Sequence, residues 1–468
     1  MSEVNLPEGW AFSTLAKSIS AHGIISDGDW VESKDQDPNG SIRLIQLADI
    51  GDGDFKNKSE RFMTPESASA LNCTFLKSGD VLIARMPDPL GRACIFPGVE
   101  QEAVTVVDVC LIRTGEDGAI SNKLLTYWIN SPTIRNLIAA NASGTTRKRI
   151  TRKKLEQFEF PLPPLAEQKV IADKLDTLLA QVETSKARLE RIPQILKTFR
   201  QSVLAAAVSG KLTEEWRESQ KIDIDSWADG TLGDFVEKPT YGSSSKSQPE
   251  GTVPVLRMGN LQDGKLDWTN LVYTSDPVEI DKYKLSSGDV LFNRTNSPEL
   301  VGKTSIYRGE REAIYAGYLI RIVCNQNLNS EYLNYLLNSP DAKDYCYRVK
   351  SDGVSQSNIN AQKLKAFPVN IPTMLEQTEI VRCVEELFAF ADRIEQNANA
   401  ALERVNNLTQ SILAKAIRGE LTADWRAANP DLISGENSAE ALLKKIKAER
   451  AALRKRSEKK TATRKKAL

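Results

Sequence analysis

The sequence predicts an α+β protein in which two pseudo-repeated α/β domains are separated by a long antiparallel two-helix coiled coil. Two observations predict this fold. The segment at residues 165–216 recurs at 374–425, and each copy carries an apolar seam typical of a long helix. The regions that precede the two copies also repeat one another, in short motifs that recur in the same order.

The repeated segment has a constant offset: Gln168 matches Gln377 and Gly210 matches Gly419, because 377 − 168 = 419 − 210 = 209. In both copies apolar residues recur at steps of three and four, the pattern of two helices packed side by side. The seam residues are Ile171, Leu175, Leu178, Val182, Leu189, Ile192, Leu196, Phe199 and Val203, and then Ile380, Val384, Leu387, Ala391, Ile394, Ala398, Ala401, Val405, Leu408 and Ile412. A single apolar seam would most simply belong to a helix buried in an ordinary core. Because this chain carries two such seams, the two helices can instead pack against each other.

Residues at the ends of the repeats mark where the two helices begin and stop. Thr373 with Glu376 three residues later is a capping box, so the second helix is expected to start there. Gly210 and Gly419 suit the residue that follows a helix end. Pro193 lies inside the first copy, where we expect it to bend or restart the helix.

The preceding regions are expected to be mixed β structure with some helix. LKSGDVLIAR at 76–85 matches LSSGDVLFNR at 285–294. Apolar runs predict strands at Val81–Ala84, Val104–Ile112, Val290–Phe292 and Tyr318–Val323. Hairpin turns are expected at Asp52-Gly53 and Asp263-Gly264, and helices at Leu124–Asn130 and Tyr332–Asn338.

Proline-rich and polar segments divide the chain. We expect a first α/β domain, a first helix, a second domain, a second helix and a basic tail that is helical at Ala439–Leu453 and loose beyond. The predicted ranges are 1–160, 161–217, 218–370, 371–426 and 427–468. Because the termini of a compact domain lie close together, the two helices are expected to run antiparallel. A helix of 27 residues (165–191) spans roughly 40 Å, comparable with the 34–36 Å of one DNA turn.

Charge and cysteine content restrict the partners and the compartment. Lys+Arg and Asp+Glu both number 62, but residues 444–468 hold 12 Lys/Arg against two Glu. The six cysteines have no CxxC spacing, which favours free thiols in a reducing cytoplasm. Neither a signal peptide nor an apolar run near twenty residues predicts export or membrane insertion.

Few residues suit catalysis. His22 is the single histidine, which disfavours Ser-His, Cys-His and His-metal sites. Val301-Gly302-Lys303-Thr304 lacks the earlier glycine of a P-loop, and the spacing of Asp49–Glu60 does not match a calcium loop. No metal site is expected. The chain is therefore interpreted as a binder.

The loops in which the two copies differ are the candidate DNA-binding elements. Framework residues agree, yet Arg147, Lys148 and Arg149 of one copy face Gln356, Ser357 and Asn358 of the other. Arg reads guanine and Gln or Asn reads adenine, so different loop residues fit two unlike half-sites; solvated surface loops are the alternative. The candidate residues are Arg85, Arg92, Thr145, Thr146, Arg147, Lys148, Arg149, Arg152, Arg294, Thr295, Asn296, Lys303, Ser355, Gln356, Ser357 and Asn358.

The repeats resemble a known family. PLPPLAEQKVIADKLDTLLAQV (161–182), QSVLAAAVSGKLTEEWR (201–217), QSILAKAIRGELTADWR (410–426) and the two SGDVL motifs resemble the specificity subunits of bacterial type I restriction–modification enzymes. The likeness spans nearly the whole chain. It implies two target-recognition domains, a bipartite asymmetric DNA target with a non-specific spacer, and a subunit without catalytic activity of its own. It does not transfer particular base contacts.

The resemblance also implies partners and cofactors. Two modification subunits would methylate adenine with S-adenosylmethionine, and two restriction subunits would use ATP and Mg, while this chain binds no cofactor. Trp216, Arg217, Trp425 and Arg426 are candidate docking residues for modification subunits; alternatively each Trp anchors its helix end in its own core. A self-contained DNA adenine methyltransferase and a non-DNA coiled-coil scaffold are the alternative functions.

Overall fold

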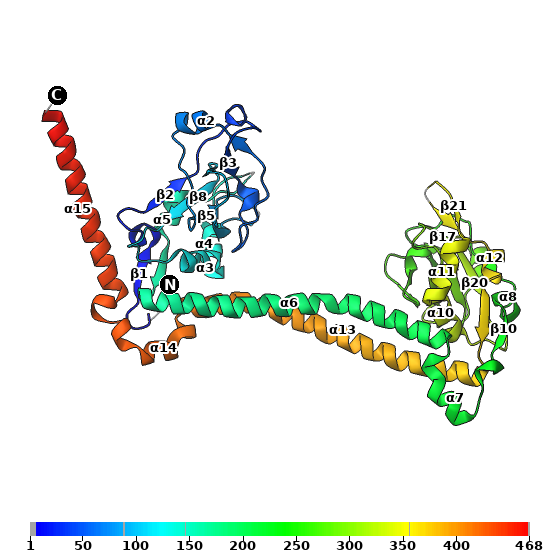
Figure 1. Ribbon diagram of the computed structural model, residues 1–468. Coiled ribbons are helices and arrows are strands. Elements are labelled where there is room, and N and C mark those ends of the chain that lie inside the picture. Colours follow the sequence, from blue (N-terminus) through cyan, green and yellow to red (C-terminus); the bar gives the residue numbers. More distant parts are fainter. Residues whose placement is uncertain (1–5, 88, 146, 355, 467–468) are drawn as a thin grey trace. The chain divides into compact units, whose positions relative to one another are not determined.

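The structure is a computed structural model that describes residues 6–87, 89–145, 147–354 and 356–466, with side chains as far as Arg456. The chain forms two compact units (Figure 1). The first unit comprises Met1–Arg188 and Ala401–Leu468, and the second comprises Leu189–Ala400. Each unit therefore holds one α/β domain together with one end of each long helix.

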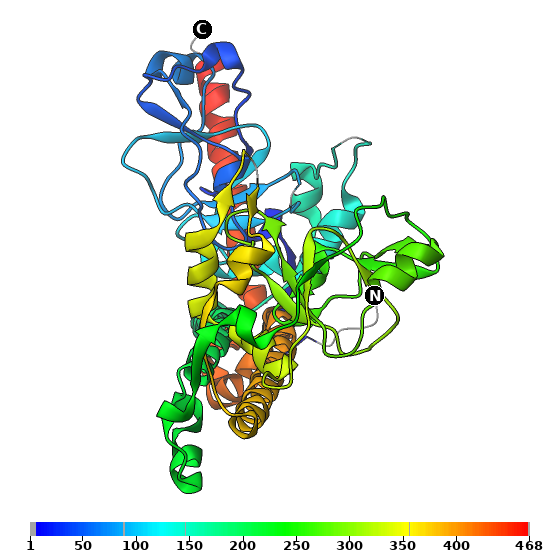
Figure 2. The same cartoon turned by 90° about the vertical axis from the view of Figure 1, so that its right-hand side faces the viewer.

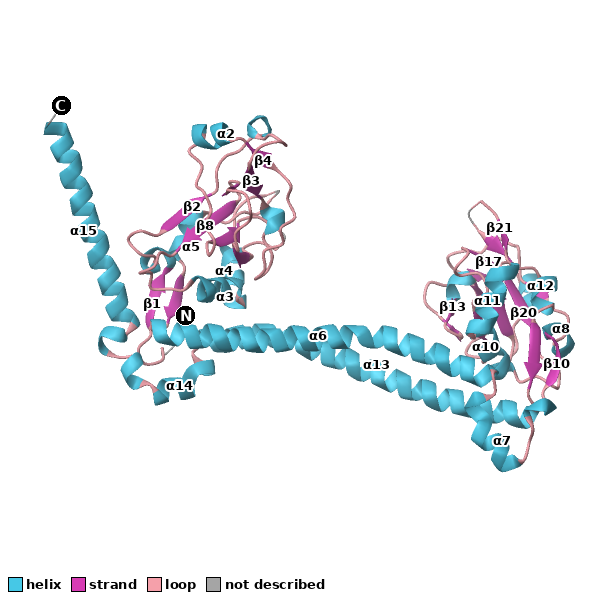
Figure 3. Ribbon diagram, viewed as in Figure 1, coloured by secondary structure: helices cyan, strands magenta, loops and turns pink. Residues whose placement is uncertain are grey.

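The repeated segments form the two long helices α6 (Leu165–Val208) and α13 (Met374–Ile417), each of 44 residues (Figure 3). Helix α6 continues through Pro193, so the expected restart at this proline is wrong. The predicted seam residues are buried or half-buried, except for Leu408, which is 45% exposed. Near the end of α13 the buried positions are instead Leu413 and Ala416.

The packing inside each unit shows that the helices are antiparallel. In the first unit Leu175, near the start of α6, shares a core with Leu413, near the end of α13. In the second unit Val203, near the end of α6, shares a core with Ile380, near the start of α13. The beginning of each helix thus packs with the end of the other, which confirms the antiparallel prediction.

The helix ends follow the sequence signals in part. Gly210 and Gly419 adopt φ values of 79° and 72°, a left-handed conformation that glycine reaches without steric cost. The Thr373 hydroxyl accepts a hydrogen bond from the Glu376 backbone N–H at 3.4 Å, as a capping box requires. The Glu376 carboxylate, however, binds elsewhere, so only half of the predicted capping box forms.

In its described residues, the domain of the first unit contains three small sheets, ordered β2-β8-β5-β6, β4-β3-β7 and β1-β9. Its strands are β1 (Ala11–Thr14), β2 (Ile24–Asp27), β3 (Ile42–Ile45), β4 (Phe62–Met63), β5 (Val81–Ala84), β6 (Ala93–Ile95), β7 (Ala103–Thr105), β8 (Val109–Arg113) and β9 (Glu159–Leu162). Its helices are α1 (Leu15–Ser18), α2 (Pro65–Ala70), α3 (Asn122–Asn130), α4 (Pro132–Asn141) and α5 (Arg152–Gln157).

The domain of the second unit repeats this order with the sheets β11-β20-β16-β18, β15-β12-β19 and β10-β23, and it adds β13-β14 and β17-β22-β21. Its strands are β10 (Ala228–Thr231), β11 (Thr240–Tyr241), β12 (Val253–Leu256), β13 (Leu261–Gln262), β14 (Lys265–Leu266), β15 (Val272–Thr274), β16 (Val290–Asn293), β17 (Thr295–Asn296), β18 (Thr304–Ile306), β19 (Ile314–Tyr315), β20 (Leu319–Ile322), β21 (Ser351–Asp352), β22 (Ser357–Asn358) and β23 (Pro368–Ile371). Its helices are α8 (Leu232–Phe235), α9 (Pro277–Tyr283), α10 (Ser330–Asn338), α11 (Pro340–Val349) and α12 (Ala361–Lys365).

The first and last strands of each domain pair with one another. In the first unit Ala11 of β1 lies opposite Leu162 of β9, and in the second unit Ala228 of β10 lies opposite Ile371 of β23. The chain therefore enters and leaves each domain at neighbouring points, as we expected for the second domain.

The predicted strands Val81–Ala84, Val290–Phe292 and Tyr318–Val323 correspond to β5, β16 and β20. At Asp52-Gly53 the structure has an isolated antiparallel bridge between Ile50 and Phe55 in place of a hairpin between two strands. The segment Val104–Ile112 is two strands, β7 and β8, because a turn at Val106–Val109 separates them. The predicted hairpin at Asp263-Gly264 joins β13 to β14 with φ values of 47° and 80°. Helices α3 and α10 cover the two predicted helical segments.

Both helix repeats end in a short helix, and the chain ends in a long one. Helices α7 (Glu214–Gln220) and α14 (Ala423–Ala428) follow the two glycines. Helix α15 (Ala439–Lys466) is the last element, red in Figures 1 and 2. The prediction that the tail is loose beyond Leu453 is wrong, because the helical backbone continues to Lys466. Among the described residues, no helix combines the length and apolar character that crossing a membrane requires.

All six cysteines lie in the described part of the chain and are free thiols. Burial raises the pKa of Cys94, Cys110 and Cys346 to about 12. Since the thiolate is the reactive form, we expect these three to resist iodoacetamide at pH 8 in the folded protein and to react after denaturation. Mass spectrometry of the alkylated peptides measures this; rapid labelling of Cys110 in the folded protein would contradict the burial.

Candidate nucleic-acid interface

Each domain brings two variable loops together at the end of its central strand. The post-strand loops, residues 85–92 and 294–303, follow β5 and β16; the hairpin loops are residues 143–149 and 351–358. The Ile150 N–H donates to the Arg85 carbonyl at 3.1 Å, and the Ile359 N–H donates to the Arg294 carbonyl at 2.9 Å. The backbone contact that joins the two loops is thus the same in both domains.

The hairpin loop of the first unit presents cations to solvent. Ser143 and Arg149 exchange backbone hydrogen bonds of 3.0 and 2.8 Å, which close the loop. Thr145, Arg147 and Lys148 are exposed between them, while Thr146 lies outside the described residues. Arg149 is half-buried, and its guanidinium lies 3.3 Å from Asp108, so part of its charge is already paired.

Two predicted DNA contacts, Arg85 and Arg92, are instead internal. Arg85 is 3% exposed and pairs with Asp27 at 2.7 Å. Burial lowers its pKa from the ordinary value, and the Asp27 carboxylate partly opposes that shift. Arg92 is 7% exposed and donates to the carbonyls of Ile50, Leu47 and Pro89. Because both guanidinium groups are buried in the domain, we reassign these residues from DNA contact to support of the loops.

Arg152 has an intermediate position. It begins α5, is half-buried, and donates to the Ile25 carbonyl at 2.8 Å. Its guanidinium also lies 3.4 Å from Glu156 and 3.7 Å from Asp27. Its role in DNA binding remains a prediction.

In the second unit, aromatic and amide side chains surround the equivalent pair of loops. Arg294, the counterpart of Arg85, lies with its guanidinium carbon 4.7 Å from the centre of the Tyr241 ring. It is half-buried. Tyr241 lies opposite Ile320 of β20, and Asp27 lies opposite Cys110 of β8. Ile320 and Cys110 occupy equivalent positions in the two domains, so Tyr241 and Asp27 do as well. An ion pair in one domain is therefore replaced by a cation–π contact in the other.

The remaining candidates of the second unit lie on or beside β17 and β22. The Asn358 amide donates to the Thr295 hydroxyl at 2.7 Å, and Ser357 is fully buried, which makes it a framework residue. Gln356 is exposed and Asn296 is half-buried. The Lys303 ammonium donates to Gln262 at 3.1 Å, and Ser355 lies outside the described residues.

Sequence reasoning missed Tyr241 and Tyr318, which are 42% and 51% exposed beside these loops. The Arg294 N–H donates to the Tyr318 carbonyl at 3.0 Å. The signal was available for Tyr318: it directly precedes β20, as Asp108 precedes β8, so the two copies differ here in chemistry as well.

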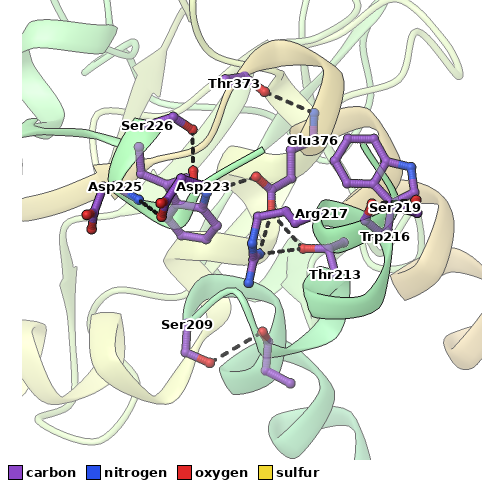
Figure 4. A network of polar contacts seen from close by, with 12 residues as sticks. Ser209, Thr213, Trp216, Arg217, Ser219, Asp223, Asp225, Ser226, Thr373 and Glu376 are labelled. Atoms are coloured by element: carbon purple, nitrogen blue, oxygen red, sulfur yellow. Dashed lines mark hydrogen bonds and ion pairs between the residues drawn. The ribbon is translucent and has the colours of Figure 1, made fainter. Parts of the chain in front are cut away.

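A second feature of the fold is a buried polar network at the start of α13, shown in Figure 4. The Glu376 carboxylate is fully buried and accepts from the Thr213 hydroxyl at 2.7 Å and the Arg217 guanidinium at 2.6 Å. Its other oxygen accepts from the Trp227 indole N–H at 2.8 Å. One carboxylate therefore connects the start of one helix, the end of the other and the first residues of the second domain.

The first unit contains the same network. The buried Glu167 carboxylate accepts from the Trp10 indole at 2.8 Å, from the Thr422 hydroxyl at 2.6 Å, and from the Arg426 guanidinium. The neighbouring Gln168 side chain accepts from the Ser121 N–H and donates to two backbone carbonyls. The Glu of the repeated Glu-Gln pair thus binds the Thr and the Arg of the repeated Thr-x-x-Trp-Arg motif within each unit.

This network corrects part of the docking prediction. Arg217 is 7% exposed, and both it and Arg426 point at an internal carboxylate, so their charges are not available to a partner. Trp216 and Trp425 are half-buried, and their role in docking remains a prediction.

Two repeated α/β domains with unlike loops, each joined to an antiparallel pair of long helices, define a class of duplicated two-domain protein. Comparison with known proteins identifies the class. The family described as "Type I restriction modification DNA specificity domain" matches residues 10–194 and 224–404.

Curated relatives agree. The chain is 44% identical over 345 residues to the type I restriction enzyme EcoKI specificity subunit of Escherichia coli (strain K12), covering 71% of this chain and 73% of that protein. It is 44% identical over 338 residues to the StySPI specificity subunit of Salmonella potsdam, covering 71% and 72%. The chain belongs to the family of type I restriction–modification specificity subunits.

A solved structure shares the fold. The HsdS subunit from Thermoanaerobacter tengcongensis superposes with a TM-score of 0.61 at 20% identity, covering 89% of this chain and 99% of that chain. The family match supports DNA recognition; it overturns the two alternatives, a self-contained methyltransferase and a scaffold that does not bind DNA.

Proposed function

We propose that this specificity subunit reads a bipartite, asymmetric DNA target, with one half-site bound by each α/β domain and the spacing set by α6 and α13. The observation that carries the proposal is the difference between two equivalent loops. The hairpin loop of the first unit exposes Arg147 and Lys148, whereas that of the second exposes Gln356. Arginine suits guanine and glutamine suits adenine in the major groove, so the two domains fit unlike sequences.

The helix pair supports the spacing role. Each helix has 44 residues, and at 1.5 Å per residue this is about 66 Å of helix. A buried Glu at the start of each helix fastens it to one domain, so the helices and domains are joined by hydrogen bonds as well as by the chain.

The chain is proposed to recognise rather than to catalyse, and to bind no cofactor itself. It docks two modification subunits, which supply S-adenosylmethionine chemistry, and two restriction subunits, which use ATP and Mg, in the bacterial cytoplasm. The single histidine, His22, supports a role without acid–base or metal catalysis. The half-buried Trp216 and Trp425, one beyond the end of each long helix, are the proposed docking points.

Expression of the chain with its modification subunits, followed by genome-wide mapping of methylated adenines, tests the proposal. We expect one motif with two different half-sites separated by a spacer of fixed length. A contiguous motif, or methylation with no sequence preference, would contradict the bipartite target.

Replacing Arg147 and Lys148 with alanine is expected to weaken binding by about 1–3 kcal/mol for each base contact that is lost. Both side chains are exposed, so their removal leaves the fold intact. Competition between duplexes in which one half-site at a time is scrambled measures the effect. The variant should lose discrimination at one half-site and keep it at the other, which serves as the internal control; unchanged discrimination at both would remove this loop from the interface.

A further inference from the structure

We propose that helix α15 is a sequence-independent DNA contact, an arm that binds the phosphate backbone beside the half-site read by the first unit. The proposal rests on the proposed function, since it needs DNA at the first domain. It adds a contact outside the two reading domains.

The first half of α15 is fastened to the first unit. Ala439 and Ile446 are 0% and 1% exposed, and they belong to the core that also contains Leu15 of α1. The Arg450 guanidinium donates to the Ala16 carbonyl at 2.7 Å and also to the Ile19 carbonyl. These carbonyls lie at the end of α1, where a helix favours a cation. The arm therefore has a defined base.

Helix α1 also connects the arm to the reading loops. It packs against α5 as well as against α15, and α5 begins directly after the hairpin loop with its exposed Arg147 and Lys148. Lys17 on α1 and Lys153 on α5 are exposed. Cationic side chains thus occur on each successive element from the hairpin loop to α15.

The second half of the arm has no apolar seam with which to dock. Among the side chains that the structure describes, which extend to Arg456, the last buried or half-buried residue of α15 is Leu453. From 454 to 468 the sequence RKRSEKKTATRKKAL holds eight Lys/Arg and one Glu. Lys455 with Lys459, and Arg456 with Lys460, are like charges four residues apart, which destabilise an isolated helix. A polyanion would neutralise these charges and favour the helix.

Charge distribution selects DNA as the polyanion. Residues 444–468 hold 12 Lys/Arg and two Glu, so the rest of the chain holds 62 − 12 = 50 cations against 62 − 2 = 60 acids. The body of the protein is thus net negative and the arm strongly positive. Duplex DNA carries one charge per about 1.7 Å, and 28 residues of helix span about 42 Å, so the arm can meet several phosphates without reading bases.

The test measures salt dependence in the complex of the full-length chain with its modification subunits. The arm variant changes Lys455, Arg456, Lys459 and Lys460 to Gln; the control exchanges Lys and Arg at the same four positions, which preserves the charge. Binding to a target duplex and to a scrambled duplex of equal length is titrated over a series of KCl concentrations. Each lost phosphate contact reduces the magnitude of the negative slope of log affinity against log salt concentration by about 0.9, so the loss of four contacts reduces it by about 3.6.

We expect the salt slope of the arm variant to be smaller in magnitude than that of the wild type by at least about two. Its affinity should fall by the same factor on the target duplex and on the scrambled duplex, and the control should match the wild type. An unchanged slope overturns the proposal, and so does a loss confined to the target duplex. Intact DNA binding with loss of the copurifying modification subunits would show that α15 binds a protein instead. Failure of the proposed function can be told apart from failure of the arm proposal. If the proposed function is wrong, the wild-type complex shows no preference for the target duplex over the scrambled one.

Discussion

Replacement of Glu376 with alanine is expected to destabilise the second unit by about 3 to 5 kcal/mol, the cost of leaving one member of a buried ion pair without its partner. The Glu376 side chain is 0% exposed and that of Arg217 is 8% exposed. The change would leave the guanidinium, the Thr213 hydroxyl and the Trp227 indole without their shared acceptor.

Amide hydrogen exchange locates this loss as well as measuring it. Protection should fall in peptides from Leu189–Ala400 in Glu376→Ala, and in peptides from the first unit in the matched variant Glu167→Ala, because each carboxylate serves only its own unit. The control is Glu420→Ala. Its pair with Arg418 is about half exposed (52% and 48%), so it should cost less than about 1 kcal/mol.

A second substitution separates the unpaired charge from the lost packing. Adding Arg217→Met to Glu376→Ala removes the buried cation and should recover part of the stability. Two results would show that the Arg217 guanidinium is not left buried and unpaired. Either Glu376→Ala lowers the free energy of unfolding by less than about 1 kcal/mol, or the double variant with Arg217→Met is less stable than Glu376→Ala alone. The network would then not be what fastens the second domain to the helices.

Deletion of seven matched residues from both long helices is expected to shorten the spacer in the methylated motif by about three base pairs, or to abolish methylation. The deleted segments would be 186–192 of α6 and 395–401 of α13, which are related by the same offset of 209 (395 − 186 = 401 − 192 = 209). Seven residues remove about 10.5 Å of helix, while one base pair of DNA rises about 3.4 Å. A heptad is close to two full turns, so the seam keeps its face.

Methylation mapping of this variant reads the spacer directly. In the control the same fourteen positions are replaced by a different helix-forming heptad of equal length that keeps the seam, and the spacer should not change. An unchanged spacer in the deletion variant would contradict the proposal that the helix pair sets the distance between half-sites.

Much of the fold could be predicted because its signals are periodic or duplicated. The apolar seams predicted α6 and α13, and the Asp263-Gly264 dipeptide predicted a hairpin that the structure contains. Two local signals failed, and for the Glu376 carboxylate a long-range contact decided the outcome. Pro193 did not restart α6, and the Glu376 carboxylate binds Arg217 and Trp227 instead of the cap of its own helix.

The candidate site was predicted less completely, because a sequence shows the type of a side chain but not its direction. Arg85 and Arg147 are equally plausible DNA contacts in the sequence. In the structure the Arg85 side chain is buried and pairs with Asp27, whereas the Arg147 side chain is exposed. Tyr241 was missed because it lies next to the reading loops in space and not in the chain. Tyr318 was missed although its position before β20, matching Asp108 before β8, marks a difference between the copies.

The sequence alone determined that this protein is a doubled unit with a helix after each α/β domain, since hydrophobic periodicity and duplication are properties of the chain itself. Only the tertiary structure decided which charged residues support the fold and which face solvent. That choice depends on whether a carboxylate partner, such as the buried Glu167 for Arg426 or the half-exposed Asp27 for Arg85, meets the side chain after folding.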